Sequence, residues 1–218
     1  MPQDLDTLRP SRGRIGQHGL FVACLGFACA LASCGLERDP DTGADIASIP
    51  RYHADAPTET LQGEHGPYSL RVMVDGLVHP WSLAFLPDGS MLVTERPGRL
   101  RRIDPDGTIS APLAGVPAVF QQGQSGLLDV VASPGFAEDA LVYISYGEPN
   151  WRGNKGGTAV ARGRLGARGL EDVQVIFRQE PKLSNGSHLG SRLAFDDDGF
   201  LFIGTGDNRI AATSQKLD

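Results

Sequence analysis

One strand–turn–strand unit occurs twice in this sequence of 218 residues. The stretch SLAFLPDGSMLVTERPGRL, residues 82–100, aligns without gaps onto RLAFDDDGFLFIGTGDNRI, residues 192–210. In both copies an apolar run ends at an Asp-Gly turn, where Gly accepts a positive φ, and a second apolar run follows. A looser copy, residues 126–149, lies between them. Strand–turn–strand copies about 40–60 residues apart are typical of a β-propeller, in which each blade is a four-stranded sheet.

The region from Tyr68 onward reads as all-β throughout. Its short apolar segments are separated by turns, and the chain holds 28 Gly and 15 Pro, which favours many short elements over long helices. A closed propeller has about four to eight blades, whereas residues 68–218 have room for about three. We therefore expect a partial propeller, the N-terminal half of a longer protein. A β-sandwich would share the short strands but would not need the same motif to return.

The N-terminal segment predicts export. Three arginines precede an apolar and small-residue run, residues 19–33, and the sequence LASC spans residues 31–34 at its end. The run is short for a membrane span but suits a signal peptide. LASC resembles the bacterial lipobox, so we predict a lipoprotein signal peptide at 1–33 and lipidation of Cys34. A plain secretory signal or a short N-terminal anchor are the alternatives.

The predicted organisation is a signal peptide at 1–33, a flexible tether at 34–66 and the propeller half at 67–218. The tether lacks apolar periodicity. Gly35 follows the cysteine, which predicts a lipid-anchored protein of the bacterial cell envelope on the periplasmic side, at the outer membrane. The start of the propeller half coincides with the start of the β-type alternation of apolar residues.

Charge and cysteine content exclude some functions. The formal net charge is −6 and the folded part has no basic cluster, which argues against nucleic-acid binding. All three cysteines lie at or before Cys34, so no disulfide framework or cysteine-based metal site is expected. No metal-binding motif occurs, and no metal ligand is assigned.

Three polar loops carry the residues that could bind a ligand or take part in a reaction. The loop at 121–129 is rich in amides that can hold a planar polar ligand. His188 could act as a general base, and Arg192 could hold a carboxylate. Asp207 and Arg209 could bind a ligand or pair with each other. Each loop also has a plain structural interpretation: a surface turn, a histidine bonded to backbone, or an Asp-Gly turn.

Several blocks together resemble a known family. PWSLAFLPDGSMLVTERPGRL, GQSGLLDVVASPGFAEDALVYISY, GTAVARGRL, VIFRQEPK and HLGSRLAFDDDGFLFIGTGDNR occur in this order. They are similar to the soluble pyrroloquinoline-quinone (PQQ)-dependent aldose sugar dehydrogenases, which include the soluble quinoprotein glucose dehydrogenases. The resemblance covers about residues 69–218. It implies a six-bladed β-propeller, which agrees with the blade pattern.

The resemblance also implies roles for individual residues. His188 would take the hydroxyl proton at the sugar's anomeric carbon while hydride passes to PQQ, giving the lactone. Gln124 would contact the cofactor, and Arg192 would support the loop. The family also uses Ca²⁺ and an external electron acceptor, and the Ca²⁺ ligands are expected beyond residue 218. This chain would hold part of the site and be inactive alone. A non-catalytic propeller lipoprotein that binds sugars or partners is the alternative.

Overall fold

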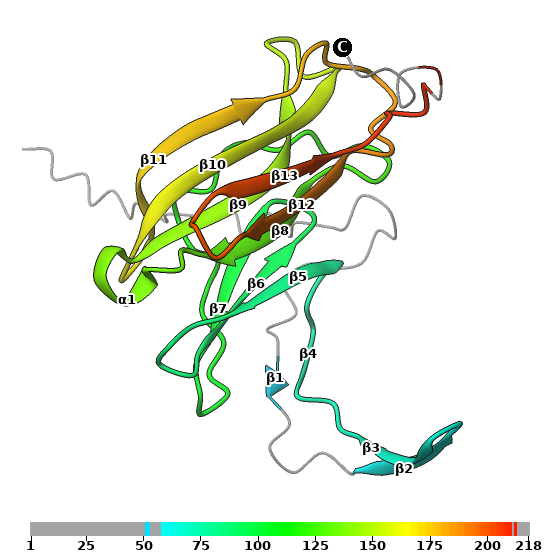
Figure 1. Cartoon of the computed structure of the whole chain (residues 1–218), viewed down its shortest axis with the longest axis vertical. Coiled ribbons are helices and arrows are strands. Elements are labelled where there is room, and N and C mark those ends of the chain that lie inside the picture. The colour runs from blue at the N-terminus through cyan, green and yellow to red at the C-terminus, as the bar shows by residue number, and fades with distance from the viewer. Residues whose placement is uncertain (1–50, 53–57, 211, 213–218) are drawn as a thin grey trace, which may run out of the picture. The chain divides into compact units, whose positions relative to one another are not determined.

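The computed structural model describes residues 51–52, 58–210 and 212, all of which belong to one compact unit, Leu36–Asp218. The predicted signal peptide and Cys34 lie outside the described residues. The described part is built of β-strands with one four-residue helix, as the sequence predicts (Figure 1). No helix within it has the length and apolar character needed to cross a membrane.

Three antiparallel sheets follow one another along the chain, and they contain three, four and two strands. Each sheet pairs strands that are consecutive in sequence, which is the meander expected of successive propeller blades. The single helix, α1, is a short turn in the connection between β8 and β9. The elements are β5 (Pro80–Phe85), β6 (Met91–Glu95) and β7 (Arg99–Ile103); β8 (Leu127–Ala132), α1 (Phe136–Asp139), β9 (Leu141–Pro149), β10 (Gly156–Gly166) and β11 (Gly169–Arg178); and β12 (Gly190–Phe195) and β13 (Leu201–Thr205).

The two sequence copies form the same hairpin. Leu83 pairs with Val93 in β5–β6, and the matching Leu193 pairs with Ile203 in β12–β13. The turn glycine has a φ of 83° in the first copy and 84° in the second. Since a residue with a Cβ rarely adopts this backbone conformation, the Asp-Gly turn fixes the register of both hairpins.

The apolar core lies between the three-stranded and the four-stranded sheets. Leu92 and Leu100 from the first pack with Leu127, Ile144 and Tyr146 from the second, and all five are 0–1% exposed. Full burial of such a side chain is worth about 1.5–3 kcal/mol. The strand pattern therefore has an energetic basis here, because the apolar positions of the two sheets face each other.

Polar side chains join neighbouring sheets inside this packing. The hydroxyl of Thr94 donates to the carbonyl of Leu128 at 2.6 Å, linking β6 to β8. The hydroxyl of Ser145 donates to the carbonyl of Ser191 at 2.7 Å, linking β9 to β12. Buried hydroxyls need such partners, so these bonds constrain how adjacent sheets align.

Four short strands precede the three sheets. A hairpin of β2 (Glu59–Gly63) and β3 (Gly66–Leu70) crosses the position where the sequence analysis ended the tether, and most of its side chains are exposed. Since neither face is buried, the segment lacks the apolar alternation that would reveal a strand. The predicted tether thus includes strand residues. The other pair is β1 (Arg51–Tyr52) with β4 (Val74–Asp75).

One end of the sheets carries most of the polar loops, and we call it the loop edge. Strands β8, β10 and β12 begin at this edge, and β9, β11 and β13 end there. Its loops are residues 121–126, 150–155, 179–189 and 206–210. A hydrogen bond of 2.9 Å from the Gln124 N–H to the Gly186 carbonyl joins two of them.

Candidate active site

His188 lies on the loop edge just before β12, and its side chain is 48% exposed. Its Nδ1 is 2.9 Å from Oδ1 of Asp207, which follows β13. A carboxylate oxygen can only accept a hydrogen bond, so this contact places a proton on Nδ1 of His188. Nε2 is then the nitrogen that can accept a proton from a ligand.

The backbone of His188 is held in a left-handed conformation, with a φ of 52°. Its N–H donates to Oε1 of Gln124 at 3.0 Å, and its carbonyl accepts from the N–H of Asn208 at 3.2 Å. A Cβ on Gly206 would lie 1.7 Å from the His188 carbonyl oxygen. A non-glycine residue with positive φ is costly and persists only when its surroundings enforce it. The bonds to Gln124 and Asn208 supply that enforcement, and Gly206 leaves room for the His188 carbonyl.

Gln124 is thereby placed beside the histidine. Its side-chain oxygen is engaged by the His188 N–H and its backbone N–H by Gly186. The amide nitrogen, which carries two hydrogens, is the group left to meet a ligand. The structure brings His188 and Gln124 together on one loop edge, as the sequence analysis expects; their chemical roles remain predictions.

Asp207 is held as a carboxylate. The hydrogen bond from His188 is the largest cause that lowers the pKa of Asp207 below its ordinary value, and the backbone N–H of Arg209, 2.9 Å from Oδ1, lowers it further. The ionised form can stabilise a positively charged imidazole. Asp207 and Arg209 are thus paired, through the arginine's backbone.

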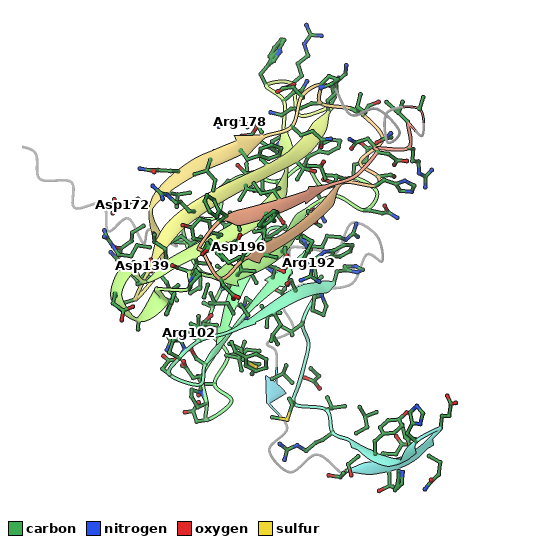
Figure 2. The ribbon with its side chains drawn as sticks, viewed as in Figure 1. Arg102, Asp139, Asp172, Arg178, Arg192 and Asp196 are labelled. Carbon is green, nitrogen blue, oxygen red and sulfur yellow. The ribbon has the colours of Figure 1, made fainter. Side chains whose placement is uncertain are left out.

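Arg192 does not join this group. Its Nη1 lies 3.4 Å from Oδ1 of Asp129, and its side chain is 78% exposed (Figure 2). Such an exposed pair contributes little. Together with Trp81 and Ser82 these residues line a cavity of about 90 Å³ between sheets.

The residue that sequence analysis overlooked is Asp129, which is 3% exposed. Its Oδ2 accepts the N–H of Leu193 at 2.7 Å, and its Oδ1 accepts the hydroxyl of Ser82 at 2.5 Å. The carboxylate of β8 therefore bonds both neighbouring sheets. An acid inside the apolar run LLDVVA was the signal, because a buried charge requires partners.

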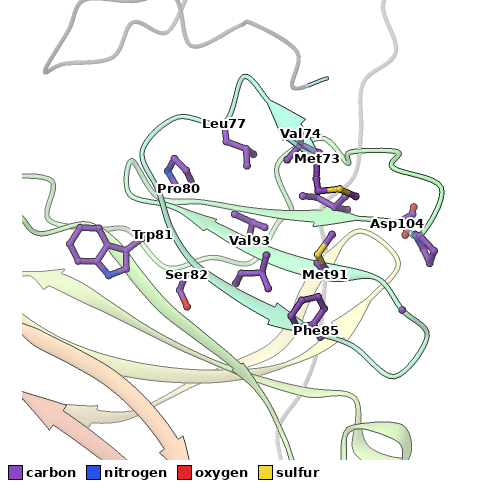
Figure 3. A pocket seen from close by; sticks show the side chains of 14 residues that line it. Met73, Val74, Leu77, Pro80, Trp81, Ser82, Phe85, Met91, Val93 and Asp104 are labelled. Carbon is purple, nitrogen blue, oxygen red and sulfur yellow. The ribbon is translucent and has the colours of Figure 1, made fainter. Parts of the chain in front are cut away.

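A larger cavity, about 650 Å³, lies away from the histidine, on the outer face of the β5–β7 sheet (Figure 3). Phe85 and Met91 are paired across β5 and β6 on this face, beside Val93, and Met73 and Leu77 line the other side. Its lining is almost entirely apolar, with no histidine among the lining residues. This cavity therefore lies over an apolar sheet face, apart from the polar loops of the loop edge.

Comparison with known proteins identifies the family of this chain. The family model for Glucose / Sorbosone dehydrogenase matches residues 77–218. An Escherichia coli protein, Aldose sugar dehydrogenase YliI, is 49% identical over 153 residues, which are 69% of this chain and 41% of that protein.

Solved structures of sugar dehydrogenases are also similar to this chain. The apo-form of the soluble aldose sugar dehydrogenase from Escherichia coli matches with a TM-score of 0.63 and 45% identity, over 74% of this chain and 44% of that chain. The PQQ-bound aldose sugar dehydrogenase from Streptomyces coelicolor matches with a TM-score of 0.60 and 30% identity, over 74% of this chain and 46% of that chain. The described sheets thus resemble part of these dehydrogenases, and the chain spans about half the length of each of these relatives, 41–46%. The chain belongs to the glucose/sorbosone dehydrogenase family.

Proposed function

We propose that this chain supplies the base-bearing part of a PQQ-dependent aldose sugar dehydrogenase with a six-bladed propeller. The reaction is oxidation of the C1 hydroxyl of an aldose to the lactone. The observation that carries the proposal is the 2.9 Å contact between His188 and Asp207 on a loop edge shared with Gln124. It gives a histidine with a defined tautomer beside an amide donor.

His188 acts as the general base. Its Nε2 accepts the proton of the C1 hydroxyl, while the C1–H bonding pair leaves carbon as a hydride and the carbonyl of the lactone forms. Asp207 keeps the imidazole oriented and stabilises the positive charge that the ring gains, as a buttressing carboxylate does in other histidine-based sites. When bound, the quinone supplies the two-electron acceptor.

The residues present fit part of a quinone site. Gln124 would hold the cofactor through its amide nitrogen, because its amide oxygen is already engaged by His188. A carbonyl or carboxylate oxygen of a quinone is a suitable acceptor for that donor. In the described part of the chain, no group of three or more His, Cys, Asp or Glu could hold a metal ion. We propose that Ca²⁺ ligands and an external electron acceptor complete the system.

The same proposal includes export and a lipid anchor. The signal-like segment and Cys34 support a location on the periplasmic side of the bacterial envelope. Mass spectrometry of the mature N-terminus tests this part, and an unmodified N-terminus at another residue would count against it.

The test of activity is a chimera. Residues 58–218 replace the corresponding segment of the Escherichia coli relative, which supplies the remaining length. With PQQ, Ca²⁺, an aldose and a reducible dye, His188→Ala should lower kcat by about 10²–10⁴ while quinone binding persists. Gln124→Ala should weaken quinone binding by about 1–3 kcal/mol. His65→Ala, in the exposed β2–β3 turn, is the matched control.

The proposal fails if His188→Ala behaves like His65→Ala in that chimera. A chimera that binds sugars without any quinone-dependent dye reduction would instead support a non-catalytic binding protein. The chain alone should give no turnover in the same assay.

A further inference from the structure

Asn185 lies in the loop that carries His188, three residues before it, and its side-chain amide makes two hydrogen bonds. Oδ1 accepts the backbone N–H of Ser187 at 3.2 Å, and Nδ2 donates to the backbone carbonyl of Asn208 at 2.7 Å. The first bond closes a turn within the histidine loop. The second joins this loop to the segment that carries Asp207. One side chain therefore connects the loop of the candidate base to the loop of its carboxylate.

The two loops are attached to each other at two points. The carbonyl of His188 accepts the N–H of Asn208 at 3.2 Å, and the carbonyl of Asn208 accepts the hydrogen bond from Asn185. The histidine loop thus bonds both polar groups of the Asn208 backbone, and Asn208 is only 7% exposed. A segment held by one bond can rotate about it, whereas two bonds fix its orientation. Because Asp207 directly precedes Asn208, the same attachment orients its carboxylate.

The attached backbone is strained on both sides. His188, Asn208 and Arg209 have φ values of 52°, 49° and 61°. A residue with a Cβ adopts this conformation at a cost and keeps it only where its surroundings enforce it. The bond between the Asn208 N–H and the His188 carbonyl, 3.2 Å, is at the long end of the normal range, whereas the bond from Asn185 is short. Loss of the shorter bond should therefore loosen both loops.

The orientation of the imidazole ring depends on this attachment. Gln124 bonds the backbone N–H of His188 and not its ring, and the histidine side chain is 48% exposed, so packing restrains the ring only weakly. The ring is held by the 2.9 Å contact between Nδ1 and Asp207. The hydrogen bond at one ring nitrogen decides which of the two carries the proton. Without the carboxylate an imidazole favours the proton on Nε2, which the proposed mechanism needs as its acceptor.

We infer that Asn185 is a positioning residue for the candidate base: its amide bridges the two loops, so that Asp207 holds the proton on Nδ1 of His188 and Nε2 stays open. The catalytic consequence rests on the proposed function, whereas the tautomer can be measured without quinone or sugar. Asparagine suits this place because one short amide supplies both the acceptor for Ser187 and the donor for Asn208. Aspartate supplies only the acceptor, and alanine supplies neither.

NMR of the histidine ring nitrogens in the full chain tests this role, in alkaline solution where the imidazole is neutral. The His188 signal is identified by its loss in His188→Ala. In the parent chain Nδ1 should carry the proton. In Asn185→Ala and in Asn185→Asp the ratio of the Nδ1–H to the Nε2–H tautomer should fall about tenfold, the usual worth of one hydrogen bond.

Asn150→Ala is the matched control on the same loop edge. Oδ1 of Asn150 accepts the N–H groups of Asn154 and Lys155 at 3.1 and 3.2 Å, and its Nδ2 donates to Oδ1 of Asn154 at 3.0 Å. This amide thus also acts as acceptor and donor, but within the β9–β10 hairpin. Its removal should leave the His188 tautomer unchanged.

The chimera with the Escherichia coli relative measures the consequence for catalysis. Asn185→Ala should lower kcat by about 10–100-fold, which is the usual effect of removing a group that orients a metal-binding histidine. The affinity for quinone should stay the same, because the variant acts through the base and not through Gln124. An unchanged kcat in this variant of an active chimera would overturn the positioning role.

Three NMR results would also overturn it: a parent with the proton on Nε2, an Asn185→Ala or Asn185→Asp chain that keeps the parent tautomer, or an equal change in Asn150→Ala. The third result would mean that any loosening of the loop edge releases the ring. If the tautomer changes as expected but the chimera oxidises no aldose, the proposed function fails, and the control of the histidine by Asn185 stands.

Discussion

Replacing Asp129 by alanine removes the charged group that joins three sheets. The carboxylate sits on β8 and is 3% exposed. It accepts the N–H of Leu193 on β12 at 2.7 Å and the hydroxyl of Ser82 on β5 at 2.5 Å. It also accepts the N–H of Val130 at 3.0 Å. Alanine would leave these donors without their acceptor.

The expected loss of unfolding free energy is about 3–5 kcal/mol. A hydrogen bond to an ionised group is worth about 1.5–3 kcal/mol, and a buried donor left unsatisfied costs about 1–3 kcal/mol. Leu193 is 2% exposed, so its N–H carries the full cost, whereas Ser82 is only partly buried and its hydroxyl can turn to water. The exposed Arg192 adds almost nothing. The loss is a large share of a domain stability of about 5–15 kcal/mol.

Urea unfolding followed by circular dichroism measures this loss. Asp198→Ala, in the exposed turn after β12, is the control and should stay within about 0.5 kcal/mol of the parent. Asp129→Asn keeps the shape and part of the bonding, so it should fall between the two and remain measurable if the alanine variant does not fold. The reasoning is refuted if Asp129→Ala and Asp198→Ala differ by less than about 1 kcal/mol.

Three further outcomes are expected. His188→Ala should raise the pKa of Asp207, because the histidine's hydrogen bond is the largest cause of its lowering; a carboxyl NMR titration that shows no change would contradict the contact. Burial acts to raise the pKa of Glu148, but hydrogen bonds from Lys182 and Arg178 have the larger combined effect and lower the pKa from 4.5. The stability that ionised Glu148 contributes is therefore fully present above the unfolded pKa of 4.5 and is lost as the pH falls through the lower folded pKa. Acid unfolding curves of Lys182→Met should be flatter in this pH range. Phe85, 74% exposed on the open apolar face, should promote self-association of the isolated chain, which Phe85→Lys reduces in sedimentation velocity; a monomeric parent that melts cooperatively would show that this face needs no cover.

The hairpins could be predicted from sequence because their determinants are local. Residues 82–100 and 192–210 each contain the alternation, the turn and the return strand within one short stretch. The observed registers confirm the alignment. Strand β2 and the start of β3 were assigned to the tether, because the exposed faces of this hairpin leave no periodic pattern.

The site could be predicted only in part. The sequence indicated which loops are polar, but the contacts join residues far apart in the chain. His188 bonds Gln124 across 64 residues, and Asp129 bonds Leu193 across 64 residues as well. Such pairings depend on which sheets become neighbours, and periodicity carries no information about that. An isolated acid in an apolar strand shows that a partner is needed without identifying it.

The two matched hairpins differ most where they reach the loop edge, and this difference explains how one repeat can serve both folding and chemistry. Directly after β6 the first copy has Arg96, whose guanidinium donates to the carbonyl of Gly123 and whose own carbonyl accepts the Leu127 N–H. A long side chain therefore secures the loop that holds Gln124. At the matching position after β13 the repeat has Gly206, where any Cβ would meet the His188 carbonyl. The first copy thus closes a loop with a side chain, and the second admits a strained histidine by lacking one. Gly206→Ala should accordingly displace His188 from Gln124 and Asp207, whereas the paired strands below would keep their register.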